Sequence, residues 1–299
     1  MKSQSHSFAL FCAFGLLVSV AGAQTGAQRG DPAGRATTPS RNQTPPIKSP
    51  FPLGVPLGNA QMAVPTVSMQ PRPFNLDTAL GRLFADFKAV AVGAEFELSV
   101  TNAGRVEVTT LPMALHVVDW RVRTELDISS VPARIESTGP FAAFRQLGIT
   151  RLTHLTLPAV RLTYLLLPEG KGFITQPLAA EDMSVLVKLE KRLVGKDTLN
   201  GVACEKSLVT LIYPNGERRE ARVWQATAGG PHPVQLQFAL NDSLITVRVR
   251  SVVNLAEQRT PEAMQQQQTL FELPRDFTQF ADVGQMLQTV SARRAQRPR

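Results

Sequence analysis

Short strands separated by turns fill the segment from Val160 to Leu273, and this pattern constrains the fold more than any other feature. Apolar and polar residues alternate along these stretches at period two, which is typical of strands with one buried face. The turn sequences are Pro168-Glu169-Gly170-Lys171, Asn200-Gly201, Pro214-Asn215-Gly216, Gly229-Gly230 and Asn241-Asp242. Turns of this composition join neighbouring antiparallel strands, so the sequence predicts a twisted antiparallel sheet. Such a sheet with an apolar face favours a container or a docking surface over an enzyme.

The alternation is clearest between Val118 and Ile128. Its predicted buried face comprises Val118, Trp120, Val122, Leu126 and Ile128, interrupted by Thr124. Its predicted solvent face comprises Asp119, Arg121, Arg123, Glu125 and Asp127. Asp119 and Glu125 invite an interpretation as paired catalytic carboxylates, but solvated strand faces carry such rows far more often, and the interleaved arginines neutralise the acids. We therefore expect a surface row.

The N-terminus has the composition of an export signal. Lys2 precedes an apolar run from Phe8 to Val20, and Ala21-Gly22-Ala23 follows it, which predicts a cleavable secretory signal over residues 1–23. The run is shorter than the ~20 residues that a membrane-spanning helix needs, so an anchor is the weaker alternative. Cys12 lacks the small residue before it that lipid modification requires. The pattern predicts an exported protein of the periplasm or cell envelope of a Gram-negative-type bacterium, with secretion from the cell as the alternative.

Two segments near the ends of the chain, residues 24–73 and 291–299, hold most of the excess of positive charge. Residues 24–73 contain ten of the 22 prolines and one acid, which predicts a disordered tether, and residues 291–299 are predicted to be a disordered basic tail. The whole chain has 32 basic and 24 acidic residues, whereas residues 74–290 have 22 and 23. We therefore expect no nucleic-acid partner; the alternative to plain solvation is attachment to an anionic membrane surface. The tail arginines available for this are Arg293, Arg294, Arg297 and Arg299.

Residues 74–290 are long enough for one sizeable β domain. Apolar residues at spacings of three and four predict helices over 76–87 and 283–290 and shorter helical stretches within 139–148 and 178–186. The polar tract Gln265–Gln268 is expected in a loop. The segment Leu270–Pro274 is expected to be strand or extended structure.

Few side chains offer catalytic or metal chemistry. Outside the signal, His116, His154 and His232 are the only histidines and Cys204 is the only cysteine, so neither a metal site nor an internal disulfide is expected. Cys204 is interpreted as a small buried apolar residue; intermolecular pairing is the minority alternative. The sequence lacks a Gly-x-Ser-x-Gly elbow and the glycine-rich phosphate-binding loops. We expect no cofactor and no enzymatic activity.

Five short motifs, in a characteristic order, carry a family resemblance. They are the strand–turn–strand Leu165–Phe173, Val187–Lys191, the hairpin Gly195–Lys206 with Asn200-Gly201 and Cys204, the pair Val223-Trp224 and Pro233-Val234, and Phe271-Glu272-Leu273-Pro274. Together they resemble the exported domain of unknown function 4412, with Asp197 where glutamate is usual. That family is similar to the LolA/LolB superfamily of outer-membrane lipoprotein-sorting and carrier proteins. The resemblance covers roughly residues 95–280; the long insertion 129–150 and the tether depart from it.

The resemblance implies a mainly β (α+β) fold, in which a strongly curved antiparallel sheet, or half-barrel, has a few helices over its concave face. It implies that a lipid or an acylated lipoprotein binds in the cavity, and no binding arginine of the carriers is matched in this chain. The predicted cavity candidates are Trp120, Val122, Leu162, Tyr164, Leu166, Phe173, Leu236 and Phe238. The alternative is a non-catalytic structural or interaction module of the envelope, whose own side chains fill the core. An enzyme ranks last.

Overall fold

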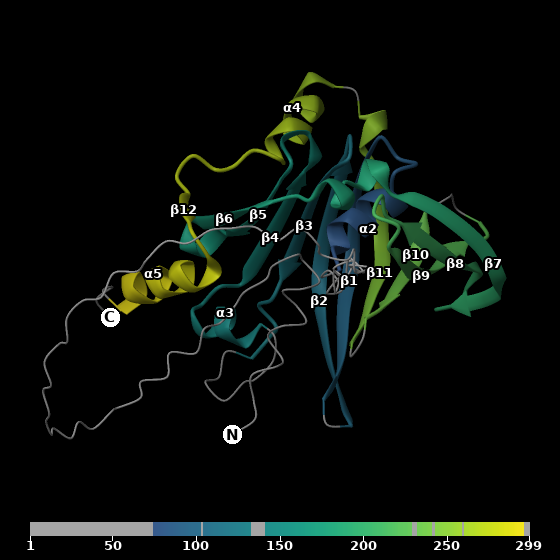
Figure 1. Cartoon of the computed structure of the whole chain (residues 1–299), viewed down its shortest axis with the longest axis horizontal. Helices are drawn as coiled ribbons and strands as arrows, with labels where there is room; N and C mark the ends of the chain where they lie inside the picture. Colours follow the sequence, from purple (N-terminus) through teal and green to yellow (C-terminus); the bar gives the residue numbers. More distant parts are fainter. Residues whose placement is uncertain are drawn as a thin grey trace, which may run out of the picture. The chain divides into compact units, whose positions relative to one another are not determined.

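One curved sheet of twelve strands organises the described part of the chain (Figure 1). This computed structural model describes residues 74–102, 104–132, 141–228, 232–240, 243–258 and 260–295; the predicted signal and tether lie outside them. The strands are β1 (Ala89–Asn102), β2 (Arg105–Val118), β3 (Arg121–Asp127), β4 (Arg151–Leu157), β5 (Leu162–Leu167), β6 (Gly172–Pro177), β7 (Lys188–Leu199), β8 (Val202–Ile212), β9 (Arg218–Ala226), β10 (Pro233–Ala239), β11 (Ser243–Asn254) and β12 (Thr278–Phe280).

The sheet is unclosed and mostly antiparallel, as the half-barrel prediction requires. Its strand order is β12-β6-β5-β4-β3-β2-β1-β11-β10-β9-β8-β7, and the short β12 lies parallel to β6. Consecutive strands are neighbours in the sheet except at two places: the chain crosses from β6 to β7, which lie toward opposite ends of the order, and from β11 to β12. The two runs of strands meet where β11 pairs with β1. The predicted fold class, a curved and mainly β half-barrel with a few helices, is confirmed.

Two-residue turns set the register of the hairpins. Asn200 and Gly201 have φ of 51° and 82°, the left-handed conformation that a tight hairpin turn needs. Asp119 and Trp120 adopt the same left-handed region, with φ of 48° and 67°. The predicted strand from Val118 to Ile128 is therefore wrong at its start, because Asp119-Trp120 forms the turn between β2 and β3. Apolar and polar residues also alternate through Asp119-Trp120, so the sequence pattern gives no sign that the strand ends there.

Four α-helices accompany the sheet within the described ranges. They are α2 (Leu76–Leu83), α3 (Ala142–Gln146), α4 (Pro261–Thr269) and α5 (Val283–Ala295). The side chain of Asn75 caps α2 by accepting a hydrogen bond from the Thr78 amide at 3.1 Å. In the described part of the chain, no helix is long and apolar enough to cross a membrane.

Three sequence predictions about the connections need correction. The segment 178–186 forms two 3-10 turns, Ala180–Asp182 and Ser184–Leu186, instead of one helix. The Gln265–Gln268 tract lies inside α4, because Thr260 caps the helix start, Pro261 occupies its first turn and glutamine is a good helix former. The segment 270–274 turns the chain and joins no strand.

The C-terminal helix extends further than its apolar pattern predicted. α5 runs to Ala295, so the first residues of the predicted disordered tail, 291–299, are helical. Alanine and arginine favour helices, and Pro298 is the first residue able to break the helix. α5 lies beside β6 and β12, where a Cβ on Gly172 would come within 2.7 Å of the Phe280 ring and 3.0 Å of the Met286 sulfur.

Residues of the hairpin motif stabilise the end of the sheet formed by β7, β8 and β9. The indole Nε1 of Trp224 donates to the Asp197 carboxylate at 2.9 Å, and the Lys206 ammonium lies 4.9 Å from the centre of the Trp224 ring. The Trp224 donor is the main reason that the pKa of Asp197 is lowered. Cys204 is buried and unpaired. These motif residues therefore have a structural explanation within the fold.

A small second core lies outside the main one and holds the C-terminal connection. Phe271 packs with Ala89 and Val118, and the guanidinium of Arg121 lies 4.6 Å from the centre of its ring. Arg123 Nη1 donates to the carbonyl of Leu270 at 2.6 Å. Phe271 is 5% exposed, so it anchors the end of α4 to β2 and β3.

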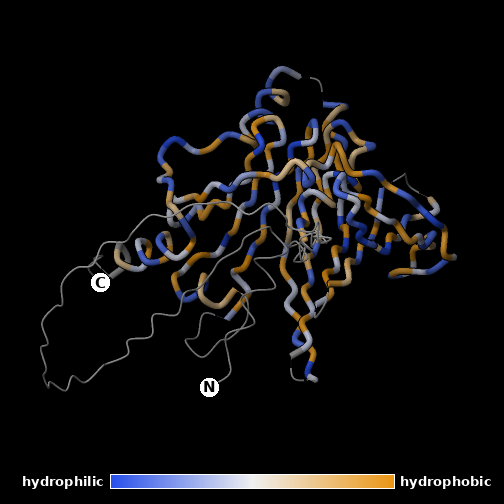
Figure 2. Tube along the Cα trace, in the orientation of Figure 1, coloured by the Kyte–Doolittle hydropathy of each residue, from blue (hydrophilic) through white to orange (hydrophobic). Residues whose placement is uncertain are grey.

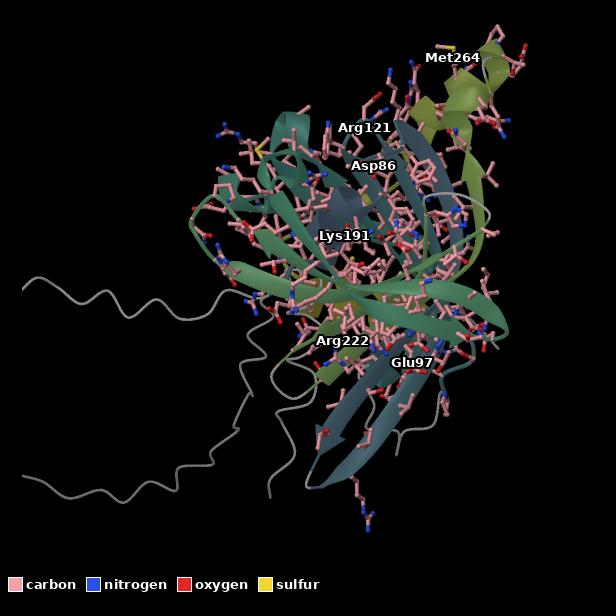
Figure 3. The ribbon with its side chains drawn as sticks, turned by 90° about the vertical axis from the view of Figure 1, so that its right-hand side faces the viewer. Asp86, Glu97, Arg121, Lys191, Arg222 and Met264 are labelled. Atoms are coloured by element: carbon pink, nitrogen blue, oxygen red, sulfur yellow. The ribbon has the colours of Figure 1, made fainter. Side chains whose placement is uncertain are left out.

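We expect Phe271→Ala to lower the free energy of unfolding by about 3 kcal/mol, because it removes the central side chain of this second core. Met264→Ala is the matched control, since Met264 is 55% exposed and lies on α4, clear of the sheet (Figure 3). The control should change stability by less than about 0.5 kcal/mol. Urea unfolding of both variants checks this, and equal midpoints would contradict the anchoring role.

Candidate functional site

The α2 helix lies against the concave face of the sheet (Figure 1). Before its first turn, the Phe74 ring is 5.1 Å from the ring of Phe238 on β10, and the helix itself contacts β3. Five neighbouring strands, from β10 to β3, would span about 19 Å if the sheet were flat, whereas eight helical residues are about 12 Å long. The sheet must therefore curve around the helix.

Registered strand partners carry their side chains on the same face, so the concave face can be followed from strand to strand. It includes Leu115, Val122, Thr124, His154, Leu165, Ile174, Val209, Val223, Leu236, Phe238 and Val247. Apolar and polar residues alternate along these strands, as Figure 2 shows. The apolar side chains of α2, including Leu76, Leu80 and Phe84, belong to the same cluster. The described concave face is thus mostly apolar.

A buried polar cluster interrupts this apolar surface under α2. Asp77 is fully buried, and its Oδ1 accepts a hydrogen bond from Thr124 Oγ1 at 2.8 Å. Its Oδ2 lies 2.9 Å from Thr156 Oγ1, which donates to it, and 2.5 Å from His154 Nδ1. His154 is 3% exposed. We call these four residues the Asp77 cluster.

Sequence reasoning missed the Asp77 cluster. Nothing in the sequence links Asp77, Thr124, His154 and Thr156, because these residues come from α2, β3 and β4. One local signal was available: Thr124 is the single polar side chain in the otherwise apolar row of β3. A hydroxyl at a core position needs a hydrogen-bond partner, and the partner here is Asp77.

The Asp77 cluster fastens α2 to the sheet. A buried carboxylate is costly unless it is paired and hydrogen-bonded, and this carboxylate has three partners from two strands. Its complete burial keeps substrates and solvent away, which argues against a role in acid–base catalysis in this conformation. Among the described residues, no three His, Cys, Asp or Glu side chains gather as a metal site would require.

A second set of bonds holds α2 from the other side. Residues 178–187, which we call the strap, connect β6 to β7. Thr78 Oγ1 donates to the carbonyl of Asp182 at 2.6 Å, and Arg82 Nε donates to the carbonyl of Val187 at 2.7 Å. Gly81 makes this arrangement possible, because a Cβ at this position would lie 2.8 Å from Val122 Cγ2 and 3.1 Å from Ser184 Oγ.

Two buried hydroxyls near the strap have no hydrogen-bond partner among the residues that the structure describes. They are Ser184 Oγ and the phenol oxygen of Tyr213, whose residues are 1% and 6% exposed. Tyr213 follows Ile212, which is paired with Lys188 at the end of the strap. Burial, and then the nearby carboxylates of Asp182 and Glu217, raise the pKa of Tyr213, so its phenol keeps its proton.

The structure divides the predicted cavity residues between two faces. Val122, Leu236 and Phe238 come together on the concave face, each no more than 1% exposed. Trp120 lies in the β2–β3 turn. The face of the sheet opposite α2 carries Leu162, Tyr164, Leu166 and Phe173. These eight residues therefore do not line one cavity.

The pairing register explains this division. His154 on β4 is paired with Leu165, and Leu165 with Ile174, so Leu165 shares the concave face with the Asp77 cluster and Leu166 points away from it. β5 is apolar on both faces, and period two alone does not choose between them. Tyr164 and Phe173 form a ring pair on the opposite face, with centroids 6.0 Å apart.

The two acids of the charged row, Asp119 and Glu125, have different surroundings. Asp119 lies in the turn before the strand with its side chain 78% exposed, whereas Glu125 accepts from Arg123 Nε at 2.5 Å. His116, the paired neighbour of Arg123, has a pKa lowered chiefly by burial. The arginine neutralises the carboxylate, as expected from the sequence.

A shallow hollow on the opposite face is too small for a lipid. Its volume is about 90 Å³, and it is lined by Leu208, Glu220, Arg222, Gln237, Ala239 and Leu244. Ligand pockets typically enclose about 300–1,000 Å³. Arg222 lies at the surface of this region (Figure 3). The concave face is therefore the better candidate site.

Comparison with known proteins gives distant structural likenesses. No protein-family model and no curated protein matches the sequence, so the assignment to the domain of unknown function 4412 stays a prediction. The chain is similar to the lipoprotein LppX of Mycobacterium tuberculosis, with 11% identity over 58% of this chain and 91% of that one and a TM-score of 0.30.

Two further solved structures show the same level of likeness. A LolA superfamily protein of Nitrosomonas europaea is 8% identical over 57% of this chain and 88% of that one, with a TM-score of 0.32. A putative outer membrane lipoprotein-sorting protein domain of Vibrio parahaemolyticus is 13% identical over 66% of this chain and 97% of that one, with a TM-score of 0.25. At such low TM-scores, the likeness says nothing about what this chain binds.

Proposed function

We propose that this protein is a non-catalytic binding protein of the bacterial envelope, and that its concave face receives an acyl chain of a lipid or of an acylated protein. The observation that carries this proposal is an apolar concave face covered by a short helix with polar fasteners. Val122, Leu236 and Phe238 are the predicted cavity residues that remain candidates for contact with the chain. Export rests on the predicted signal, and attachment to anionic membranes rests on the tail arginines.

The helix α2, which covers the concave face, depends on few polar contacts and can therefore be displaced. An isolated helix of eight residues has little stability in water, so α2 depends on its contacts with the sheet and the strap. The polar contacts described above are the Asp77 cluster and the two hydrogen bonds to the strap. Displacement of α2 would expose an apolar surface that an acyl chain can occupy.

The rival function is a structural or interaction module with a self-filled core. The specific observation in its favour is that Leu76, Leu80 and Phe84 of α2 are fully buried in one cluster with Leu236 and Phe238. A module of this kind would keep α2 in place and bind no acyl chain. The two functions therefore differ in whether α2 ever leaves the sheet.

We expect the purified protein to bind the fluorescent fatty acid 11-(dansylamino)undecanoic acid, with saturable enhancement of the dansyl emission. Thr124→Val should tighten the apparent affinity by about threefold to tenfold, because it removes a hydroxyl that donates to Asp77 and so raises the fraction of molecules with α2 released. Fluorescence titration of both proteins provides the measurement.

Thr163→Val is the matched control. Thr163 also lies on the concave face and is buried, but its hydroxyl donates to the Gln176 carbonyl instead of Asp77. Its affinity for the probe should equal that of the parent protein. Absence of probe binding, together with absence of co-purifying lipid in native mass spectrometry, would favour the self-filled module.

A further inference from the structure

The unpartnered hydroxyls of Ser184 and Tyr213 lie at the junction of three elements. Val187 donates its amide to the Ser184 carbonyl at 3.3 Å, and the Val187 carbonyl accepts from Arg82 of α2. The next residue of the chain, Lys188, is paired with Ile212, and Tyr213 follows. Ser184 Oγ also lies beside Gly81 of α2. Both hydroxyls therefore belong to the region where the strap, α2 and the end of β8 meet.

These hydroxyls are two of five buried side-chain atoms that have no hydrogen-bond partner in the described part of the chain; the others are His116 Nδ1, Thr153 Oγ1 and Ser207 Oγ. Buried polar groups in proteins nearly always have a hydrogen-bond partner, because an unmet donor lowers the stability of the fold. The Asp77 cluster, only a few residues away on α2, meets that rule with three hydrogen bonds to one carboxylate. Of the five atoms, the hydroxyls of Ser184 and Tyr213 are the two at the strap, and together they point to a ligand as their acceptor.

We propose that Ser184 and Tyr213 form a subsite for the uncharged carbonyl of an acyl ester or acyl amide, an inference that rests on the proposed acyl-binding function. Each hydroxyl would donate a hydrogen bond to the carbonyl oxygen, while the acyl chain occupies the apolar concave face. The subsite would thus select the class of ligand: esterified or amide-linked acyl chains in place of free fatty acids.

The surrounding charges support the choice of an uncharged acceptor. Burial is the main cause of the raised pKa of the Tyr213 phenol, and the nearby carboxylates of Asp182 and Glu217 raise this pKa further. The same negative field disfavours a ligand carboxylate, and the phenol, which keeps its proton, is a hydrogen-bond donor. The positive charge of Arg219 opposes this field, but the Arg219 guanidinium is paired with Glu217, with Nη2 2.5 Å from Oε1. An ester or amide carbonyl brings no charge, so it avoids the repulsion.

The experiment compares methyl laurate with laurate as competitors for the bound dansyl fatty acid. We expect the ester to displace the probe at lower concentration than the free acid. Tyr213→Phe and Ser184→Ala should each weaken the ester about threefold to tenfold and leave the acid unchanged, since each removes one hydrogen bond to a neutral carbonyl. Tyr164→Phe is the matched control, because Tyr164 lies on the opposite face, and it should retain the preference.

Thermal unfolding of the same variants provides a second readout. Neither hydroxyl has a partner within the described ranges, so Tyr213→Phe and Ser184→Ala should melt at or above the temperature of the parent protein. A clear decrease would show that the hydroxyls hold a structural water, and it would overturn the subsite. An unchanged ester preference in both variants would also overturn it. A protein that binds no dansyl probe at all would instead refute the proposed function.

Discussion

Asp77→Ala is expected to lower the free energy of unfolding by about 3–5 kcal/mol, the largest effect that we predict for a single substitution. Alanine removes the acceptor for two threonine hydroxyls and the partner of His154 Nδ1, and all three groups are buried with it. The loss therefore includes the cost of unmet polar groups in addition to the lost hydrogen bonds. Urea unfolding followed by circular dichroism measures it.

Asp86→Ala is the matched control for this substitution. Asp86 lies in the turn after α2 and is exposed (Figure 3), so its removal should change stability by less than about 0.5 kcal/mol. Asp77→Asn keeps the shape of the side chain and one acceptor oxygen, so its loss of stability should lie between those of Asp77→Ala and Asp86→Ala. This variant replaces Asp77→Ala in the experiment if Asp77→Ala does not fold. In Asp77→Ala/Thr124→Val, the two losses should not add, because both substitutions break one hydrogen bond. Additive losses, or equal effects of Asp77→Ala and Asp86→Ala, would contradict the fastening role.

Phe238→Ala should cost about 3–5 kcal/mol, whereas Phe173→Ala should cost clearly less. Phe238 is 1% exposed, packs against Phe74 at the start of α2 and belongs to the main core. Phe173 is partly exposed on the face opposite α2, where its described ring partner is Tyr164. The same substitution therefore creates a cavity in the core at Phe238, whereas at Phe173 it removes only contacts at the surface.

This pair of phenylalanines tests which face of the sheet is the interior. Both residues were candidates for one cavity from the sequence, and the register separates them. Unfolding midpoints of the two variants under one set of conditions give the answer. A larger loss for Phe173→Ala would mean that the apolar face of β5 and β6 opposite α2 is the tighter core.

Local features of the fold could be predicted because their causes are local. The Asn200-Gly201 hairpin follows from the left-handed turn that these residues favour, and the strands around it follow from period-two alternation. The same reasoning failed at Asp119-Trp120, where the residues do not favour such a turn. Pairing between Val118 and Arg121 compensates for their conformation, and that pairing belongs to the sheet.

The sequence alone determined that this chain forms an antiparallel sheet with few helices and with no visible catalytic motif, because turns and alternation are encoded within a few residues. Only the tertiary structure decided which face is the interior, since β5 is apolar on both sides and its register with β4 makes the choice. It also decided the site. Asp77 and His154 are 77 positions apart, and Ser184 and Tyr213 belong to segments that only the pairing of Lys188 with Ile212 brings together, so no local pattern could reveal either arrangement.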